Sequence, residues 1–76
     1  MHTASLTFPF DDEPTAKSIL RALEPEAAEG PDGTTTHLSL EGTTLHVEVT
    51  GDDLSGLRAA IHSVVRLLDA AQRTLA

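Results

Sequence analysis

Residues 37–49 (HLSLEGTTLHVEV) decide the fold of this 76-residue chain. On either side of Gly42-Thr43, apolar side chains alternate with polar ones, which is the period-two pattern of half-buried strands. A two-residue turn at Gly42-Thr43 would pair residues 38–41 with residues 44–47 in antiparallel order. This register places the apolar side chains of both segments on one face, and they are Leu38, Leu40, Leu45, Val47 and Val49. The stretch therefore predicts a β-hairpin whose register is supported by both segments.

An alternating segment also precedes the hairpin, because Leu6, Phe8 and Phe10 are separated by Thr7 and Pro9. This pattern predicts a further strand. Pro9 has no N–H group to donate to a neighbouring strand, so this strand should lie at an edge of the sheet or present Pro9 outward.

A short helix is predicted to follow this strand. Residues 11–13 (DDE) supply an N-cap and an acidic first turn, and Pro14 is tolerated in that turn. Apolar residues then recur at helical spacing, at Ala16, Ile19, Leu20 and Leu23. We expect the helix to end before Pro25, and residues 25–33 (PEAAEGPDG) to form a polar loop.

A long helix is predicted to begin after Asp52 or Asp53, either of which can cap it, because no proline or glycine follows Gly56. Its apolar residues repeat in alternating steps of three and four, at Leu54, Leu57, Ile61, Val64, Leu68, Ala71 and Leu75. At about 1.5 Å per residue this helix spans roughly 33 Å, which exceeds the length of an eight-residue strand. Part of the helix should therefore extend beyond the sheet.

The predicted fold class is α+β, with the element order β-α-β-β-α in a single domain of residues 1–76. A right-handed crossover and a tight hairpin give a three-stranded antiparallel sheet in the order 1-3-2, with two helices on one face and two free edges. The chain has two Phe and neither Trp nor Tyr, and a domain of this size buries only about 60% of its unfolded surface. This thin core favours a dimer, in which a partner supplies further burial.

Charge and composition argue against several classes of function. Twelve acidic and five basic residues give a formal net charge of −7, which disfavours autonomous nucleic-acid binding and is compatible with a high-salt cytoplasm. The absence of cysteine excludes thiol chemistry and cysteine-bound zinc. The first ten residues lack the features of a signal peptide, and no run reaches the roughly 20 apolar residues of a membrane span. We therefore expect a cytoplasmic protein that does not contact a membrane.

Histidines are the residues best suited here to acid-base or metal chemistry. In the predicted register, His37 lies opposite Glu48 and diagonal to His46 on the outer face of the sheet. Two hairpin histidines without a further ligand more often form a solvated face, or a face buried in a dimer, than a metal site. The helix start explains the carboxylates of residues 11–13, and no serine occupies a nucleophile motif. The sequence therefore predicts no catalytic residue, metal site or cofactor, and no enzyme activity.

The long helix presents more apolar surface than one sheet requires. Its apolar residues span about 160° of the helix circumference, whereas a helix that faces a sheet needs only about 100°. Small residues in the adjacent sector would let another helix approach closely. The predicted partner interface consists of Ala59, Ala60, Ser63, Leu67, Ala70, Ala71 and Thr74. The alternative is that the excess apolar surface packs against the first helix.

All five basic residues lie on the two predicted helices, and Arg58, Arg66 and Arg73 fall within about 80° of one another on the long helix. One interpretation is a solvated stripe paired with Asp69 and nearby acids. The other is a contact stripe for RNA phosphates or for an acidic partner.

Residues 53–68 (DLSGLRAAIHSVVRLL) resemble the signature helix of the small dimerisation subunit of the archaeal and eukaryotic KEOPS complex, the Pcc-type family. That signature runs approximately D-L-x-x-L-R-A-x-x-N-S-x-x-R. Arg58 and Ser63 match motif positions, and His62 stands where the family usually has Asn. The N-terminal order of a strand, a helix and the EPE segment at residues 24–26 is similar to that family as well.

The resemblance implies a function that the residues alone do not reach. It implies a non-catalytic subunit that dimerises with itself or with a paralogue, and that docks through its helices onto the catalytic, threonylcarbamoyl-transferring subunit. It also implies support for the modification of tRNA to threonylcarbamoyladenosine, with tRNA contacted indirectly or through few residues. The helix face adds Arg66 and Arg73 as candidates for such contacts. The alternatives are an autonomous small RNA-binding module and a homodimer that binds a metal or a small ligand.

Overall fold

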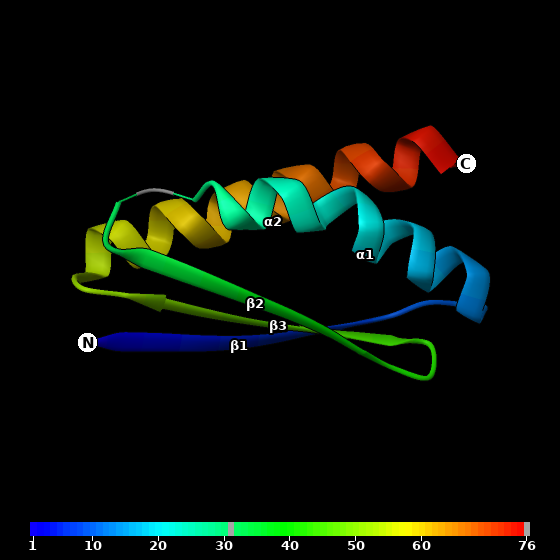
Figure 1. Cartoon of the computed structure of the whole chain (residues 1–76), viewed down its shortest axis with the longest axis horizontal. Coiled ribbons are helices and arrows are strands. Elements are labelled where there is room, and N and C mark those ends of the chain that lie inside the picture. The colour runs from blue at the N-terminus through cyan, green and yellow to red at the C-terminus, as the bar shows by residue number, and fades with distance from the viewer. Residues whose placement is uncertain (31, 76) are drawn as a thin grey trace.

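The computed structural model describes residues 1–30 and 32–75. Figure 1 shows a twisted sheet covered by two helices, in the predicted order of elements. The elements are β1 (His2–Pro9), α1 (Glu13–Ala28), β2 (Thr34–Glu41), β3 (Thr44–Gly51) and α2 (Leu54–Leu75). The α+β fold class is therefore confirmed.

The three strands form an antiparallel sheet in the order β1-β3-β2, as predicted. In the part of the chain that the structure describes, β3 is therefore central and each outer strand has a free edge. Leu6 of β1 and Leu38 of β2 both pair with Val47 of β3, which makes one apolar row across the sheet. At the hairpin turn Gly42 has a φ of 63°, and no described non-glycine residue has a positive φ. A positive φ at the first turn position alone is the pattern of a type II′ turn, whose twist matches that of the strands.

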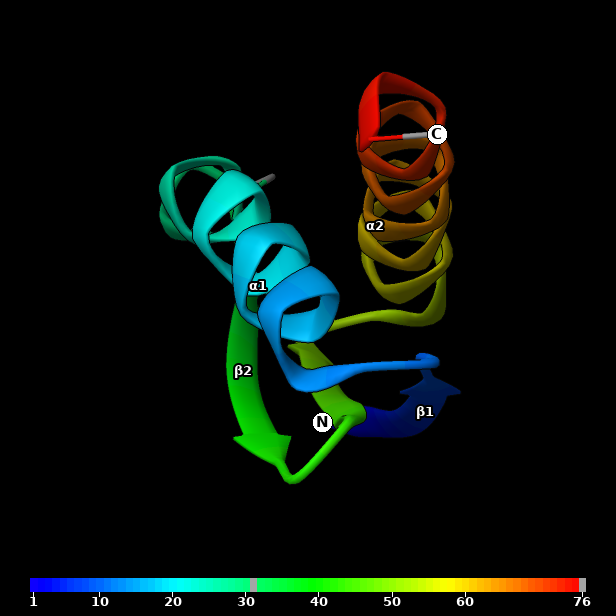
Figure 2. The ribbon, with the colours of Figure 1, turned by 90° about the vertical axis from the view of Figure 1, so that its right-hand side faces the viewer.

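Both helices cover the same face of the sheet. Figure 2 shows α1 above β2 and α2 on the side of β1, and α1 makes most of its sheet contacts with β2. The buried hydrophobic side chains between the two layers are Ala16, Ile19, Leu23, Leu45, Val47, Val49, Leu57, Ala60, Val64 and Leu68. The sheet thus has one apolar face under the helices and one polar, uncovered face.

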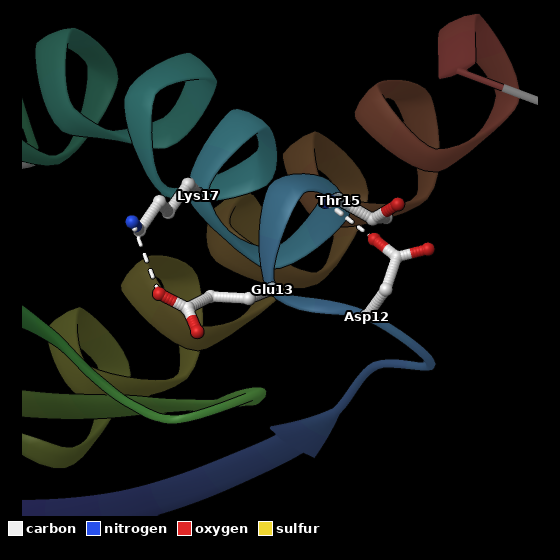
Figure 3. A network of polar contacts seen from close by, with 4 residues as sticks. All are labelled: Asp12, Glu13, Thr15 and Lys17. Atoms are coloured by element: carbon white, nitrogen blue, oxygen red, sulfur yellow. Dashed lines mark hydrogen bonds and ion pairs between the residues drawn. The ribbon is translucent and has the colours of Figure 1, made fainter.

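The start of α1 agrees with the sequence prediction. Asp12 is the N-cap, and its Oδ1 accepts a hydrogen bond of 2.8 Å from the Thr15 backbone N–H. Pro14 lies in the first turn, and Glu13 forms an exposed ion pair of 3.0 Å with Lys17 (Figure 3). Hydrogen bonds from the Thr15 side chain and then from its backbone N–H lower the pKa of the Asp12 carboxyl below its ordinary value of 3.8.

The depressed pKa of Asp12 predicts a pH-dependent contribution to stability. Because the folded pKa lies below the unfolded one, the contribution is complete above about pH 5 and is lost as pH falls through the folded value. Urea unfolding should show that wild type is more stable than Asp12→Asn at neutral pH and that the difference disappears in acid. Asp11→Asn is the matched control, because Asp12 provides the cap. A difference that stays constant with pH would contradict this assignment.

The predicted end of α1 is wrong, since the helix continues through Pro25 to Ala28 and the loop is shorter than expected. A proline inside a helix removes the hydrogen bond to the carbonyl four residues earlier, here that of Arg21. Arg21 is exposed, so water can satisfy this carbonyl. Burial offsets the remaining cost, because Leu23 is 3% exposed and Ala27 is half-buried. The Glu29 backbone N–H closes the last turn by donating to the Glu26 carbonyl at 3.1 Å.

The start of α2 is fixed by Asp53, whose Oδ1 accepts a hydrogen bond of 2.7 Å from the Gly56 backbone N–H. The first turn of α2 lies directly on Gly51, the last residue of β3. A Cβ atom at Gly51 would lie 2.9 Å from the backbone nitrogen of Leu57. From this contact the 22-residue helix runs above the sheet, and Figure 1 shows its C-terminal end farther from the strands than its N-terminal end.

The face that α2 buries is rotated relative to the apolar seam predicted from the sequence. Leu57, Ala60, Val64 and Leu68 are 2–7% exposed. Ile61, a member of the predicted seam, is only partly buried. The core-facing line therefore runs through Val64, with Ile61 and Leu67 on its two flanks.

Candidate functional site

The candidate functional site is a groove between the C-terminal half of α1 and the middle of α2. Its narrow apolar part holds about 20 Å³, room for little more than one water molecule or methyl group. The side chains and backbone that line this part are Leu23, Glu26, Ala27, Gly30, Thr36, Leu38, Ala60, Ser63, Val64 and Leu67. We call the whole feature the interhelical groove.

The interhelical groove widens toward solvent into a hollow of about 340 Å³. This part is lined by Glu26, Glu29, Gly30, Ser63, Arg66, Leu67 and Ala70. The two parts share Glu26, Gly30, Ser63 and Leu67, so they are adjacent sections of one surface. The groove therefore has an apolar floor and a charged mouth, with carboxylates on the α1 wall and one guanidinium on the α2 wall.

Four of the seven predicted interface residues line the groove, and three lie outside its lining. Ser63, Leu67 and Ala70 line the groove, and Ala60 forms part of its floor at 2% exposure. Ala71 packs against the core, whereas Ala59 and Thr74 are exposed outside the groove lining. The Thr74 hydroxyl donates a hydrogen bond of 3.0 Å to the Ala70 carbonyl within α2.

Sequence reasoning missed the α1 wall of the groove. The sequence pattern predicts a helix that ends before Pro25, which places Glu26, Ala27 and Gly30 in the loop of residues 25–33. The signal was present, because Ala27 follows Leu23 by four residues and continues the apolar face of α1. The alternative that the excess apolar surface of α2 packs against α1 thus holds in part, since Leu67 flanks the groove between the two helices.

The three arginines of α2 are all exposed. Arg73 forms an ion pair of 3.2 Å with Asp69, four residues earlier. Within residues 1–30 and 32–75, neither Arg58 nor Arg66 forms an ion pair. With Asp69 as its single carboxylate, α2 carries a net charge of +2 in a chain of net charge −7.

The opposite flank of α2 presents apolar side chains to solvent. Leu54 and Val65 are each 46% exposed, and Ile61 is partly buried. At 100° per residue these three lie within about 40° of one another, on the flank away from Leu67 and hence away from α1. The neighbouring strand on that side is β1, whose outer edge has no partner strand among the described residues.

Two histidines, His37 and His46, lie on the outer face of the sheet in the predicted register. His37 pairs with Glu48, while His46 lies between Thr7 of β1 and Ser39 of β2. No three His, Asp or Glu side chains of the described residues converge to hold a metal ion. None of the described helices is long and apolar enough to cross a membrane.

Comparisons with known proteins agree with this fold. A family model described as "Transcription factor Pcc1" matches residues 3–76. Among solved structures, a chain in the crystal structure of the binary complex Gon7-Pcc1 superposes with a TM-score of 0.86 at 23% sequence identity. The alignment covers 97% of this chain and 91% of that one. No curated protein sequence matches the chain.

Proposed function

This chain belongs to the Pcc1 family, and from that membership we propose that it is a non-catalytic KEOPS subunit that supports threonylcarbamoyladenosine modification of tRNA. The family match spans residues 3–76 and includes the signature helix at residues 53–68, on which the resemblance to the small KEOPS subunit rests. The subunit acts by holding other components together, with the catalytic, threonylcarbamoyl-transferring subunit as its main partner.

The observation that carries the docking part of the proposal is the interhelical groove. An amphipathic helix that lies in such a groove anchors itself by apolar side chains spaced along one face. The narrow floor over Leu23 and Val64 has room for one methyl group of such an anchor, and Ser63 and Ala70 are small enough to let a third helix come close. Arg58 and Arg73 lie outside the lining of the groove and remain candidates for contact with tRNA phosphates or with an acidic partner.

Co-expression with the catalytic subunit from the same source tests this proposal. The two proteins should co-elute as a stable complex from a size-exclusion column. Separate elution at micromolar concentrations of both proteins would contradict the proposed function.

The dimerisation part of the proposal uses the edge of β1 and the adjacent flank of α2. A second copy, or a paralogue, that pairs with β1 extends the sheet and covers the apolar row of Leu54, Ile61 and Val65. Support comes from the exposure of this row beside a free edge, and from the resemblance to a dimerisation subunit.

Sedimentation of the isolated chain should therefore show a dimer at micromolar concentration. Val65→Asp should dissociate the dimer and leave the fold intact, because this side chain is 46% exposed and the added carboxylate stays solvated in the monomer. Thr35→Asp, at an exposed position on β2, adds the same charge away from this flank and should keep the dimer. A well-folded wild-type monomer in high salt would remove the dimer from the proposal.

A further inference from the structure

The charges at the carboxyl end of α1 oppose the stability of its last turn. A helix carries partial negative charge at its C-terminus, which basic side chains normally compensate. The last turn of α1 contains no basic residue. It contains Glu26, and Glu29 is its C-cap residue, so two carboxylates add to the negative end of the helix. Pro25 also removes one hydrogen bond, to the Arg21 carbonyl, just before this turn.

These unfavourable charges face the interhelical groove. Glu26 lines both its apolar and its wide part, and Glu29 lines the wide part. In the described portion of the chain, neither side chain forms an ion pair, and neither does Arg66 on the facing wall. Both carboxylates and the helix end are therefore available to a cation that enters the groove from outside.

We propose that the groove selects a helix that carries a lysine or arginine beside its apolar anchor, and that this cation contacts Glu26 and Glu29 at the end of α1. This inference rests on the proposed docking function and specifies the chemistry of the docking partner. A methyl group of the apolar anchor enters the narrow part, which has room for little more, and the rest of the anchor lies over Leu67. An acidic residue farther along the same helix then faces Arg66 across the wide part. Opposite charges in this order complement both walls of the groove.

Two charge reversals on α1 test the proposal. Glu26→Lys changes a side chain in the groove, whereas Glu24→Lys makes the same charge change two residues away, outside the groove lining. Glu26→Lys relieves unfavourable charge in the last turn of α1, and Glu24→Lys replaces an exposed side chain just before that turn, so neither should lower the thermal midpoint, and both change the net charge equally. Binding to the purified catalytic subunit should fall at least about tenfold for Glu26→Lys, and stay within about twofold of wild type for Glu24→Lys. A lysine or arginine of the partner's docking helix changed to glutamate should then restore binding to Glu26→Lys.

The outcomes separate this inference from the docking function. Equal effects of the two reversals would show that net charge alone matters and would overturn the inference. Undiminished binding by Glu26→Lys, together with lost binding by Leu67→Asp, would also overturn it while the docking function stands. Failure of wild type to bind the catalytic subunit would overturn both.

Discussion

Replacing Val64 with aspartate should unfold the domain, whereas replacing Leu67 with aspartate should leave it folded and prevent docking. Val64 is 6% exposed and belongs to the core. A buried, unpaired carboxylate costs several kcal/mol, and the free energy of unfolding of such a chain is about 4–11 kcal/mol in total. Leu67 is half-buried beside the groove mouth, where an added carboxylate can reach water.

Thermal melts followed by circular dichroism and a pull-down with the catalytic subunit separate the two effects. Leu67→Asp should keep a cooperative melt but lose the partner, because it places a charge on the apolar surface that we propose as the docking site. Ser55→Asp is the matched control, since Ser55 is exposed on the same helix and does not line the groove. Retention of the partner by Leu67→Asp would mean that the groove is not the docking site.

Replacing Gly51 with alanine should destabilise the domain by about 1–3 kcal/mol, the typical cost of forcing extra volume into a packed site. The new Cβ atom would lie 2.9 Å from the nitrogen and 3.1 Å from the Cα of Leu57, and 3.2 Å from the Asp53 carbonyl oxygen. These are backbone atoms at the start of α2, so no side chain can rotate to make room. The helix must move away from the sheet, which also alters the width of the groove.

Urea unfolding measures the Gly51 effect directly. Thr50→Ala makes the neighbouring residue smaller on the outer face of the sheet, adds no atom beneath α2, and should cost about 1 kcal/mol or less. An unfolding free energy for Gly51→Ala equal to that of wild type would show that the α2 start shifts freely over β3. In that case Gly51 would not set the position of the helix.

The sheet and the order of elements could be predicted because their signals agree with one another. The apolar rows of the hairpin, the turn at Gly42 and the period of the helices all require the same arrangement, and the structure has it. The end of α1 could not be predicted in this way. A local rule about Pro25 competes with the burial of Leu23 and Ala27, and that burial depends on contacts far away in the sequence.

For the same reason, only one wall of the candidate site could be predicted from the sequence. The α2 wall, with Ser63, Leu67 and Ala70, follows from helical periodicity alone. The α1 wall depends on where α1 ends and how it lies beside α2, which periodicity does not reveal. Likewise, the seam residue Ile61 is only partly buried, because contacts with α1 and β3 decide which line of a broad apolar arc enters the core.

The separation of charge between α2 and the rest of the chain has a kinetic consequence. The helix of net charge +2 lies on a body of net charge −9, so charges of opposite sign are unevenly distributed and give the molecule a dipole. A dipole turns during diffusion to face a partner whose charges are arranged in the opposite sense, which raises the fraction of encounters that lead to docking. The association rate constant should therefore fall steeply as ionic strength rises, while the dissociation rate constant changes little. In concentrated salt, partners of this subunit have to find it by unguided collision.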